Sequence, residues 1–147
     1  MNKSFDTCRL VLKKFEDINL HDYYTILQDN SSLIVDFDKA YENFIELEHS
    51  DNYFAICLKA TTHAIGYIYV EEVSKGKYEV GYLMNAAYEN CGYASEALTA
   101  IASELTSENN YLVGIVDKKN IKPFKLLENC KKFSTLNFFK IIAYSKD

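Results

Sequence analysis

One glycine followed by a long amphipathic run constrains the fold more than any other feature of the sequence. After Gly92, apolar residues recur at positions i, i+3, i+4, i+7, i+8 and i+11, a spacing that places them on one face of an α-helix. These residues are Ala94, Ala97, Leu98, Ile101, Ala102 and Leu105. The segment 77–84, before the glycine, has the composition of a β-strand. The sequence therefore predicts a strand, a short loop, and a glycine that opens a helix with one buried face.

The other strand candidates are distributed as in a mixed α/β domain. Besides Lys77–Met84, strands are predicted over five apolar or β-branched segments: Asp6–Phe15, Tyr53–Leu58, Ala64–Val70, Tyr111–Val116 and Phe133–Tyr144. The three strands between residues 53 and 84 are joined by short connections, at 59–62 and 74–76, and predict an antiparallel meander. We expect a single domain over residues 1–147, with a mixed, twisted central sheet and helices on both of its faces.

Three further helices are predicted from apolar side chains at helical spacing. The first carries the apolar residues Leu20, Tyr23, Tyr24 and Leu27. The second runs from about Lys39 to Leu47, and its apolar face is predicted to consist of Tyr41, Phe44 and Ile45. The last spans Asn120–Asn129, with Asn120 as its N-cap.

Composition and charge argue against several classes of protein. Sixteen Lys and Arg stand against twenty-one Asp and Glu, which gives a net charge of −5, and 48% of the residues are hydrophobic. An acidic chain without a basic block is not expected to bind nucleic acid. No apolar run approaches the ~20 residues that cross a bilayer, and residues 1–6 lack the apolar core of a secretory signal. We therefore expect a cytoplasmic protein without a membrane partner.

The cysteines and histidines do not predict a metal site. No two cysteines have the C-x-x-C spacing of a zinc site or a redox dithiol, and the three histidines are equally scattered. The cysteines are Cys8, Cys57, Cys91 and Cys130, and we interpret them as buried thiols. No metal is expected as a cofactor.

The loop before the central helix is the strongest candidate for a binding site. The first backbone N–H groups of a helix have no partner within the helix, and they lie at the positive end of its dipole, which favours a phosphate. Gly92 would let such a phosphate approach the backbone closely. From these residues alone, a loop that binds no phosphate and contains a glycine only for its conformation is an equally good interpretation.

Residues 88–98 resemble the acetyl-CoA signature of the GNAT superfamily of N-acetyltransferases, which is a Gln or Arg, two residues, Gly, one residue, then Gly or Ala. Gly92 and Ala94 fill the last two fixed positions. The run 92–98 is most similar to the branch that includes the ribosomal-protein alanine acetyltransferases. Other stretches similar to that branch follow in the expected order: Thr7–Leu12, Ile65–Ile68, Gly81–Leu83, Asn120 and Leu126–Glu128. The resemblance implies a GNAT-like α/β fold with a splayed cofactor gap between the fourth and fifth strands.

The resemblance also implies the substrates and the residues that would bind them. The cosubstrate would be acetyl-CoA, and the acceptor a primary amine, either a protein N-terminus or a small amine; we expect a monomer or a homodimer. Strand residues would pair their backbone with the pantetheine arm, and N–H groups of the loop would hold the pyrophosphate. The implied cofactor contacts are Leu83, Met84, Asn85, Asn90, Cys91, Gly92, Tyr93, Ala94, Ser95, Asn120 and Phe124.

Glu79 and Asn120 match positions that the resemblance associates with catalysis. Glu79 would take a proton from the acceptor ammonium, directly or through water, so that the amine can attack the thioester carbonyl. A backbone N–H near Met84 would stabilise the resulting oxyanion. Asn120 would contact CoA or an ordered water. Two alternatives stay open: Glu79 as a surface carboxylate paired across strands, and Asn120 as a simple helix cap. Strand alternation places Glu79, Gly81 and Leu83 on one face of the sheet.

The sequence departs from the family pattern at several points. Glu89 stands where the signature has Gln or Arg, and it brings a negative charge near the expected pyrophosphate. Pro123 and Leu127 occupy positions where the family often has a Ser or Tyr that assists the leaving thiolate. The region 133–147 is shorter than the corresponding part of the family. These departures leave a second hypothesis, a non-catalytic module of the same fold that binds acyl-CoA or another protein.

Overall fold

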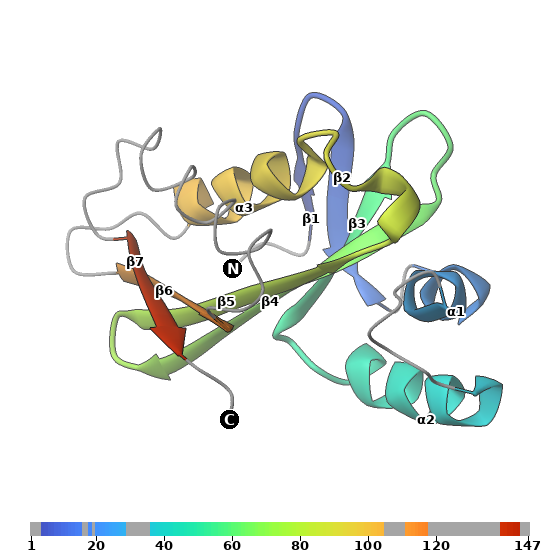
Figure 1. The fold of residues 1–147 in the computed structure, drawn as a ribbon, viewed down its shortest axis with the longest axis horizontal. Coiled ribbons are helices and arrows are strands. Elements are labelled where there is room, and N and C mark those ends of the chain that lie inside the picture. Colours follow the sequence, from blue (N-terminus) through green and yellow to red (C-terminus); the bar gives the residue numbers. More distant parts are fainter. Residues whose placement is uncertain are drawn as a thin grey trace.

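The structure, a computed structural model, describes residues 4–15, 18, 20–28, 36–104, 111–117 and 139–144. One seven-stranded sheet contains the strands in their sequence order (Figure 1). The strands are β1 (Ser4–Asp6), β2 (Leu10–Lys14), β3 (Tyr53–Leu58), β4 (Ala64–Ser74), β5 (Lys77–Met84), β6 (Tyr111–Asp117) and β7 (Phe139–Tyr144). The helices are α1 (Leu20–Gln28), α2 (Phe37–Glu48) and α3 (Tyr93–Glu104), with a 3₁₀ turn, η2 (Ala86–Tyr88), before α3. Neighbouring strands are antiparallel from β1 to β5 and parallel from β5 to β7, so the predicted mixed sheet is confirmed.

The first predicted strand is divided into two. Instead of one strand over Asp6–Phe15, β1 and β2 form an antiparallel hairpin in which Asp6 pairs with Val11. Thr7 closes the turn, because its N–H donates to the carbonyl of Leu10 over 2.9 Å and its hydroxyl accepts the N–H of Leu10 over 3.0 Å. The prediction of a continuous strand was wrong. Strand propensity depends on the type of each residue and does not account for a side-chain hydroxyl that stabilises a tight turn by bonding to the backbone.

The meander of β3, β4 and β5 has the predicted order and antiparallel pairing. Strands β3 and β5 have the predicted bounds, whereas β4 continues past Val70 to Ser74. Thr62 and Gly76 lie in the two connecting turns and have positive φ angles of 65° and 79°. Such left-handed residues reverse the chain within a tight turn.

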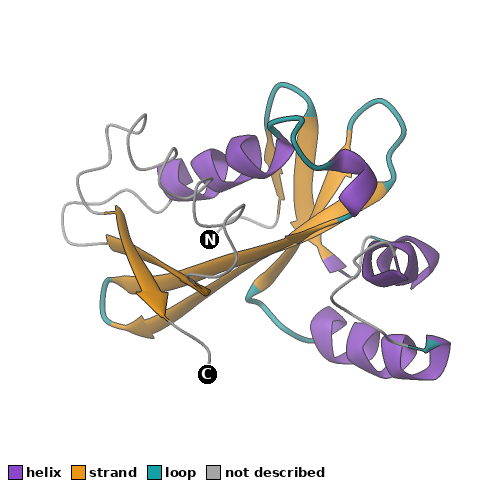
Figure 2. Ribbon diagram, viewed as in Figure 1, coloured by secondary structure: helices purple, strands orange, loops and turns teal. Residues whose placement is uncertain are grey.

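Helix α3 covers one face of the sheet, and α1 and α2 cover the other (Figures 1 and 2). Strand side chains that pack towards α3 include Leu10, Leu12, Phe54, Ile56, Ile68, Val80 and Met84. The opposite face packs against residues of α1 and α2, with Phe15, Tyr53, Tyr67 and Leu83 among its members. The predicted placement of helices on both faces is therefore confirmed.

The buried face of helix α2 differs from the predicted face. Ala40 and Phe44 are buried and Leu47 packs beside them, at positions i, i+4 and i+7. In contrast, Tyr41 is 49% exposed and Ile45 is 37% exposed. The predicted face was therefore wrong for Tyr41 and Ile45. The helix carries two overlapping apolar stripes, and a short sequence pattern does not decide which of them faces the sheet.

Strands β5 and β6 pair over only part of their length. Their parallel ladder runs from Lys77 opposite Tyr111 to Val80 opposite Gly114. Beyond this point, among the described strands, β5 pairs only with β4, and β6 only with β7. The predicted splay between the fourth and fifth strands, here β5 and β6, is confirmed. It leaves one backbone edge of residues 81–84 without a neighbouring strand in the described part of the sheet.

The close approach of β4 to β5 makes a prediction about stability. A Cβ atom on Gly66 would lie 2.5 Å from the carbonyl oxygen of Leu83 and 3.0 Å from the sulfur of Met84, so Gly66→Ala must push the strands apart. We expect it to lower the free energy of unfolding by about 1–3 kcal/mol in urea denaturation. Gly81→Ala is the matched control, because a Cβ there meets nothing within 4 Å. Equal destabilisation by both substitutions would contradict the strand packing.

Candidate functional site

The connection from β5 to α3 is built around Asn85. Its buried side-chain oxygen accepts the N–H of Ala87 over 2.9 Å. Its backbone N–H donates to the carbonyl of Ile65 over 2.7 Å, and its own carbonyl accepts the N–H of Tyr88 over 2.9 Å. Both backbone groups of Asn85 are therefore used within the protein. Of the three residues expected along the pantetheine arm, Leu83 and Met84 lie on the part of β5 that pairs with no strand on the β6 side among the described residues.

Two residues with left-handed backbone shape the loop before α3. Asn90 has a φ angle of 62° and Gly92 one of 81°. Asn tolerates this conformation better than most side chains, and Gly adopts it without strain. The carbonyl of Gly92 accepts the N–H of Glu96 over 3.0 Å, which is the first hydrogen bond of the helix. The N–H groups of Tyr93, Ala94 and Ser95 precede this bond and lie at the positive end of the helix dipole, where an anion is favoured.

An ion pair ties this loop to the turn between β1 and β2. The Nε of Arg9 donates to the carboxylate of Glu96 over 2.8 Å, its backbone N–H donates over 3.0 Å, and the hydroxyl of Thr7 donates to the same carboxylate. Burial alone would raise the pKa of Glu96, but these hydrogen bonds and the charge of Arg9 together lower it below its ordinary value. The guanidinium also donates to the carbonyl of Cys91 over 3.0 Å and lies 4.2 Å from the ring centre of Tyr93.

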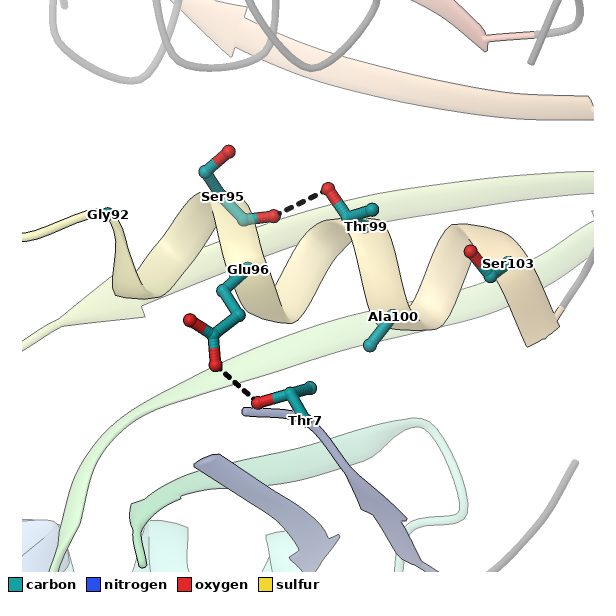
Figure 3. A pocket seen from close by; sticks show the side chains of 7 residues that line it. All are labelled: Thr7, Gly92, Ser95, Glu96, Thr99, Ala100 and Ser103. Atoms are coloured by element: carbon teal, nitrogen blue, oxygen red, sulfur yellow. Dashed lines mark hydrogen bonds between the residues drawn. The ribbon is translucent and has the colours of Figure 1, made fainter. Parts of the chain in front are cut away.

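An open hollow of about 480 Å³ follows α3 from this loop (Figure 3). Its residues come from the start of α3, from the following turns of the helix and from the turn after β1. They are Thr7, Gly92, Ser95, Glu96, Thr99, Ala100 and Ser103. Hydroxyl side chains recur along one side of the helix, and the hydroxyl of Thr99 donates to the carbonyl of Ser95 over 2.8 Å. A polar ligand that reaches the Gly92 loop can extend into this hollow.

Glu79 lies on the opposite face of the sheet. On β5, Leu83 packs with residues of α1 and α2, whereas Tyr78 packs towards α3, as strand alternation predicts. Glu79 shares the face of Leu83 and is half-buried. Its cross-strand neighbours are Glu71 on β4 and Val113 on β6. The carboxylate is therefore separated by the sheet from the core beneath α3.

Tyrosines and a second carboxylate share this face with Glu79. The hydroxyl of Tyr69 donates to Glu71, and the ring of Tyr53 lies 5.1 Å from that of Tyr69. Burial, with a contribution from the charge of Glu71, raises the pKa of Tyr53, so its hydroxyl is protonated at neutral pH. Gly81 lies opposite Tyr69, and open space takes the place of a side chain there. An acidic and aromatic surface of this kind can attract a cation.

Two of the described cysteines are exposed. Cys57 is buried in β3, and burial raises the pKa of its thiol to about 11. Cys8 and Cys91 lie in connections and are exposed, so the prediction of buried thiols was wrong for both. Among the described residues, no group of three or more His, Cys, Asp or Glu side chains is placed to hold a metal ion. None of the described helices has the length and apolar character needed to cross a membrane.

Part of the predicted site lies outside the described residues. This applies to Asn120 and Phe124, and to the departures from the family pattern at Pro123 and Leu127. Their predicted roles stay predictions. Glu89 is described: it is half-buried at the end of η2, and its backbone N–H donates to the carbonyl of Ala86 over 3.3 Å.

Comparison with protein families gives one match that covers most of the chain. Residues 9–131 match the model of the acetyltransferase (GNAT) domain. No curated protein matches this sequence.

Several solved structures have a similar fold. A GNAT-family acetyltransferase from Bacillus anthracis is 17% identical, with a TM-score of 0.73, over 86% of this chain and 81% of the other. A proposed ribosomal-protein-serine acetyltransferase from Vibrio cholerae is 20% identical, with a TM-score of 0.72, over 88% and 84%. A chimera based on the Vibrio cholerae spermidine N-acetyltransferase is 21% identical, with a TM-score of 0.59, over 83% and 79%. At these identities the likeness shows the fold.

Proposed function

The chain belongs to the GNAT family of acetyltransferases, and from this premise we propose that it transfers the acetyl group of acetyl-CoA directly to a primary amine in a ternary complex. The observation that carries the proposal is the edge of β5 at residues 81–84, which no described strand pairs with and which leads into the loop at Gly92. A pantetheine arm carries amide groups, and these can hydrogen-bond to an open strand edge as another strand would. The start of α3 favours the pyrophosphate at the other end of the same ligand.

The loop and its surroundings fit a nucleotide-bearing ligand. Gly92 has no side chain to keep a phosphate from the backbone, and its left-handed conformation turns the chain sharply into α3. The hollow beside it continues along the hydroxyl-bearing side of the helix, which offers polar contacts to the nucleotide half of CoA (Figure 3). We therefore assign the loop to the pyrophosphate and the edge at Leu83 and Met84 to the pantetheine arm.

The proposed reaction needs one proton acceptor and one leaving group. The acceptor ammonium gives a proton to Glu79, directly or through water, and the freed lone pair forms a bond to the carbonyl carbon of the thioester. The developing oxyanion is stabilised by a backbone N–H near Met84. The C–S bond then breaks, and CoA leaves as a thiolate that takes up the second proton of the amine. The products are the acetylated amine and CoA.

The face that carries Glu79 supports a cationic acceptor. Glu79 and Glu71 lie opposite each other on neighbouring strands, an arrangement that costs energy through repulsion unless a cation lies between or near them. The rings of Tyr53 and Tyr69 border the same surface. A protonated amine satisfies both carboxylates and can also contact an aromatic face. A protein N-terminus and a small amine both carry such a group.

Calorimetric titration tests the cofactor assignment. Acetyl-CoA is expected to bind with micromolar affinity, and desulfo-CoA, which keeps the pyrophosphate half, is expected to bind comparably. Free pantetheine lacks the pyrophosphate and should bind at least about 100-fold more weakly, since it loses the contacts with the start of α3. Absence of binding by acetyl-CoA would overturn the proposal.

A screen of amines then tests the transfer. Because Cys8 and Cys91 are exposed thiols, a thiol reagent for released CoA would react with the enzyme as well. The acetylated amine should therefore be followed by mass spectrometry. Binding of acetyl-CoA with no product from any protein N-terminus or small amine would favour the non-catalytic hypothesis.

A further inference from the structure

Arg9 contacts the cofactor loop on both sides of its glycine. Its Nη1 donates to the carbonyl of Cys91 over 3.0 Å, before Gly92. Its guanidinium carbon lies 4.2 Å from the ring centre of Tyr93, and its Nε binds Glu96 over 2.8 Å, both after Gly92. A Cβ atom on Gly92 would itself lie 3.3 Å from Nη2 of Arg9. One guanidinium from the turn before β2 therefore contacts the loop on both sides of Gly92.

The loop and α3 have no cation of their own. Residues 78–117 contain no Lys, Arg or His, whereas Glu89 and Glu96 lie in the loop and in the first turns of the helix. The helix dipole supplies the equivalent of only about half an elementary charge. The signature position that usually holds Gln or Arg is occupied by Glu89. Arg9 is the basic residue that the described structure brings to this loop, and its side chain is 42% exposed.

The bond to Cys91 fixes the orientation of the peptide between residues 91 and 92. In a trans peptide the carbonyl and the N–H point in opposite directions, and the described chain has no cis peptide. Because Arg9 holds the carbonyl of Cys91, the N–H of Gly92 points away from the guanidinium. Glu96 holds Arg9 in this position, since its carboxylate accepts hydrogen bonds from the backbone N–H and the Nε of Arg9 and from the hydroxyl of Thr7.

We propose that Arg9 is a positioning residue for cofactor binding: it orients the 91–92 peptide so that the N–H of Gly92 faces the pyrophosphate, and it supplies the positive charge that the loop lacks. The inference rests on the proposed function. It assigns this role to the turn between β1 and β2, 87 residues before Glu96 in the sequence. The backbone N–H, Nε and Nη1 of Arg9 donate hydrogen bonds to described residues, and Nη2 does not. Nη2 lies beside Gly92 and can donate to a ligand there.

The experiment compares CoA and pantetheine as ligands of the wild type and of Arg9→Gln. We expect Arg9→Gln to weaken CoA binding by at least about tenfold, the effect of losing a charged hydrogen bond, with no change in the affinity for pantetheine. In steady-state assays the KM for acetyl-CoA should rise while kcat at saturation changes little. Lys59→Gln removes an exposed charge from the neighbouring hairpin and is expected to bind CoA like the wild type. Heat unfolding shows whether each variant is folded.

Arg9→Lys keeps the positive charge and changes the hydrogen bonds that orient the loop, so it separates these two contributions to CoA binding. It also tests the proposal if Arg9→Gln does not fold. Arg9 reaches Glu96 through Nε and the carbonyl of Cys91 through Nη1, and the single nitrogen of a lysine lacks this planar, forked arrangement of donors. We therefore expect Arg9→Lys to bind CoA more weakly than the wild type, as Arg9→Gln does. Wild-type CoA affinity in Arg9→Lys, or equal losses for CoA and pantetheine in either variant, would overturn the positioning role. A wild type that does not bind CoA would instead overturn the proposed function, and the assignment of Arg9 with it.

Discussion

Gly92→Glu is expected to abolish the binding of acetyl-CoA while the protein still folds. The substitution places a side chain where the phosphate should approach, and it adds a negative charge at the start of α3. The φ angle of 81° adds strain, and the new Cβ would lie 3.3 Å from Nη2 of Arg9. The new carboxylate would compete with Glu96 for Arg9. Together these effects should weaken binding by roughly 100-fold or more in calorimetric titration.

Two control variants separate the causes of this loss. Gly92→Ala keeps the strain and the contact with Arg9 but adds no charge, so it should lose less affinity than Gly92→Glu. Ser74→Glu adds the same charge at the last residue of β4, beside the turn at the other end of β5, where it should leave the affinity unchanged. Circular dichroism and heat unfolding establish that each protein is folded. A folded Gly92→Glu variant with wild-type affinity would show that the pyrophosphate does not bind at this loop.

The regular elements of the fold were predictable because their patterns are local. Helix α3 shows its buried face in six apolar positions, and five of them, Ala94, Ala97, Leu98, Ile101 and Ala102, are buried in the described structure. The meander of β3, β4 and β5 was predictable from alternation and from short polar connections. The turn at Thr7 was not, since a hydroxyl that bonds to the backbone of Leu10 leaves no trace in hydrophobic periodicity.

The sequence also did not predict which of two possible faces of helix α2 is buried. In α2, Ala40 and Phe44 face the core, and Tyr41 and Ile45 remain exposed, although both pairs have helical spacing. The decision is made by the partner surface, which on this side of the sheet is crowded with rings such as those of Phe15 and Tyr23. Ala40 and Phe44 pack into this cluster, and the pattern of α2 alone does not show that the cluster is there.

The candidate site was predictable where it depends on consecutive residues and not where it depends on distant ones. The strand, the loop at Gly92 and the following helix form one continuous segment, so their order could be recognised. Arg9 and Glu96 are 87 residues apart, and nothing local marks them as partners. The signal that was available is indirect: a loop expected to bind phosphates lies within forty residues that lack any basic side chain, so the charge had to come from another segment.

Glu79→Gln is expected to lower the rate of transfer most strongly at a pH below the pKa of the acceptor amine. There the acceptor is an ammonium, and it must lose a proton before it can attack, which is the role proposed for Glu79. General bases contribute about 10²–10⁴-fold, so we expect a loss of at least about 100-fold in kcat near pH 6 for a protein N-terminus, whose pKa is about 8. As the pH rises through this pKa, the fraction of free amine grows, and the difference between variant and wild type should shrink.

Glu72→Gln is the matched control for Glu79→Gln. Glu72 lies on β4 opposite Tyr78, on the face of the sheet away from Glu79, and its carboxylate accepts the hydroxyl of Tyr78 over 2.8 Å. The substitution removes the same charge from the neighbouring strand, and it should leave the pH profile unchanged. Binding of acetyl-CoA should be equal in both variants, because neither residue lies at the Gly92 loop. If Glu79→Gln reduces the rate by the same factor at every pH, Glu79 does not accept the proton, and the cross-strand carboxylate is a structural feature of the acceptor face.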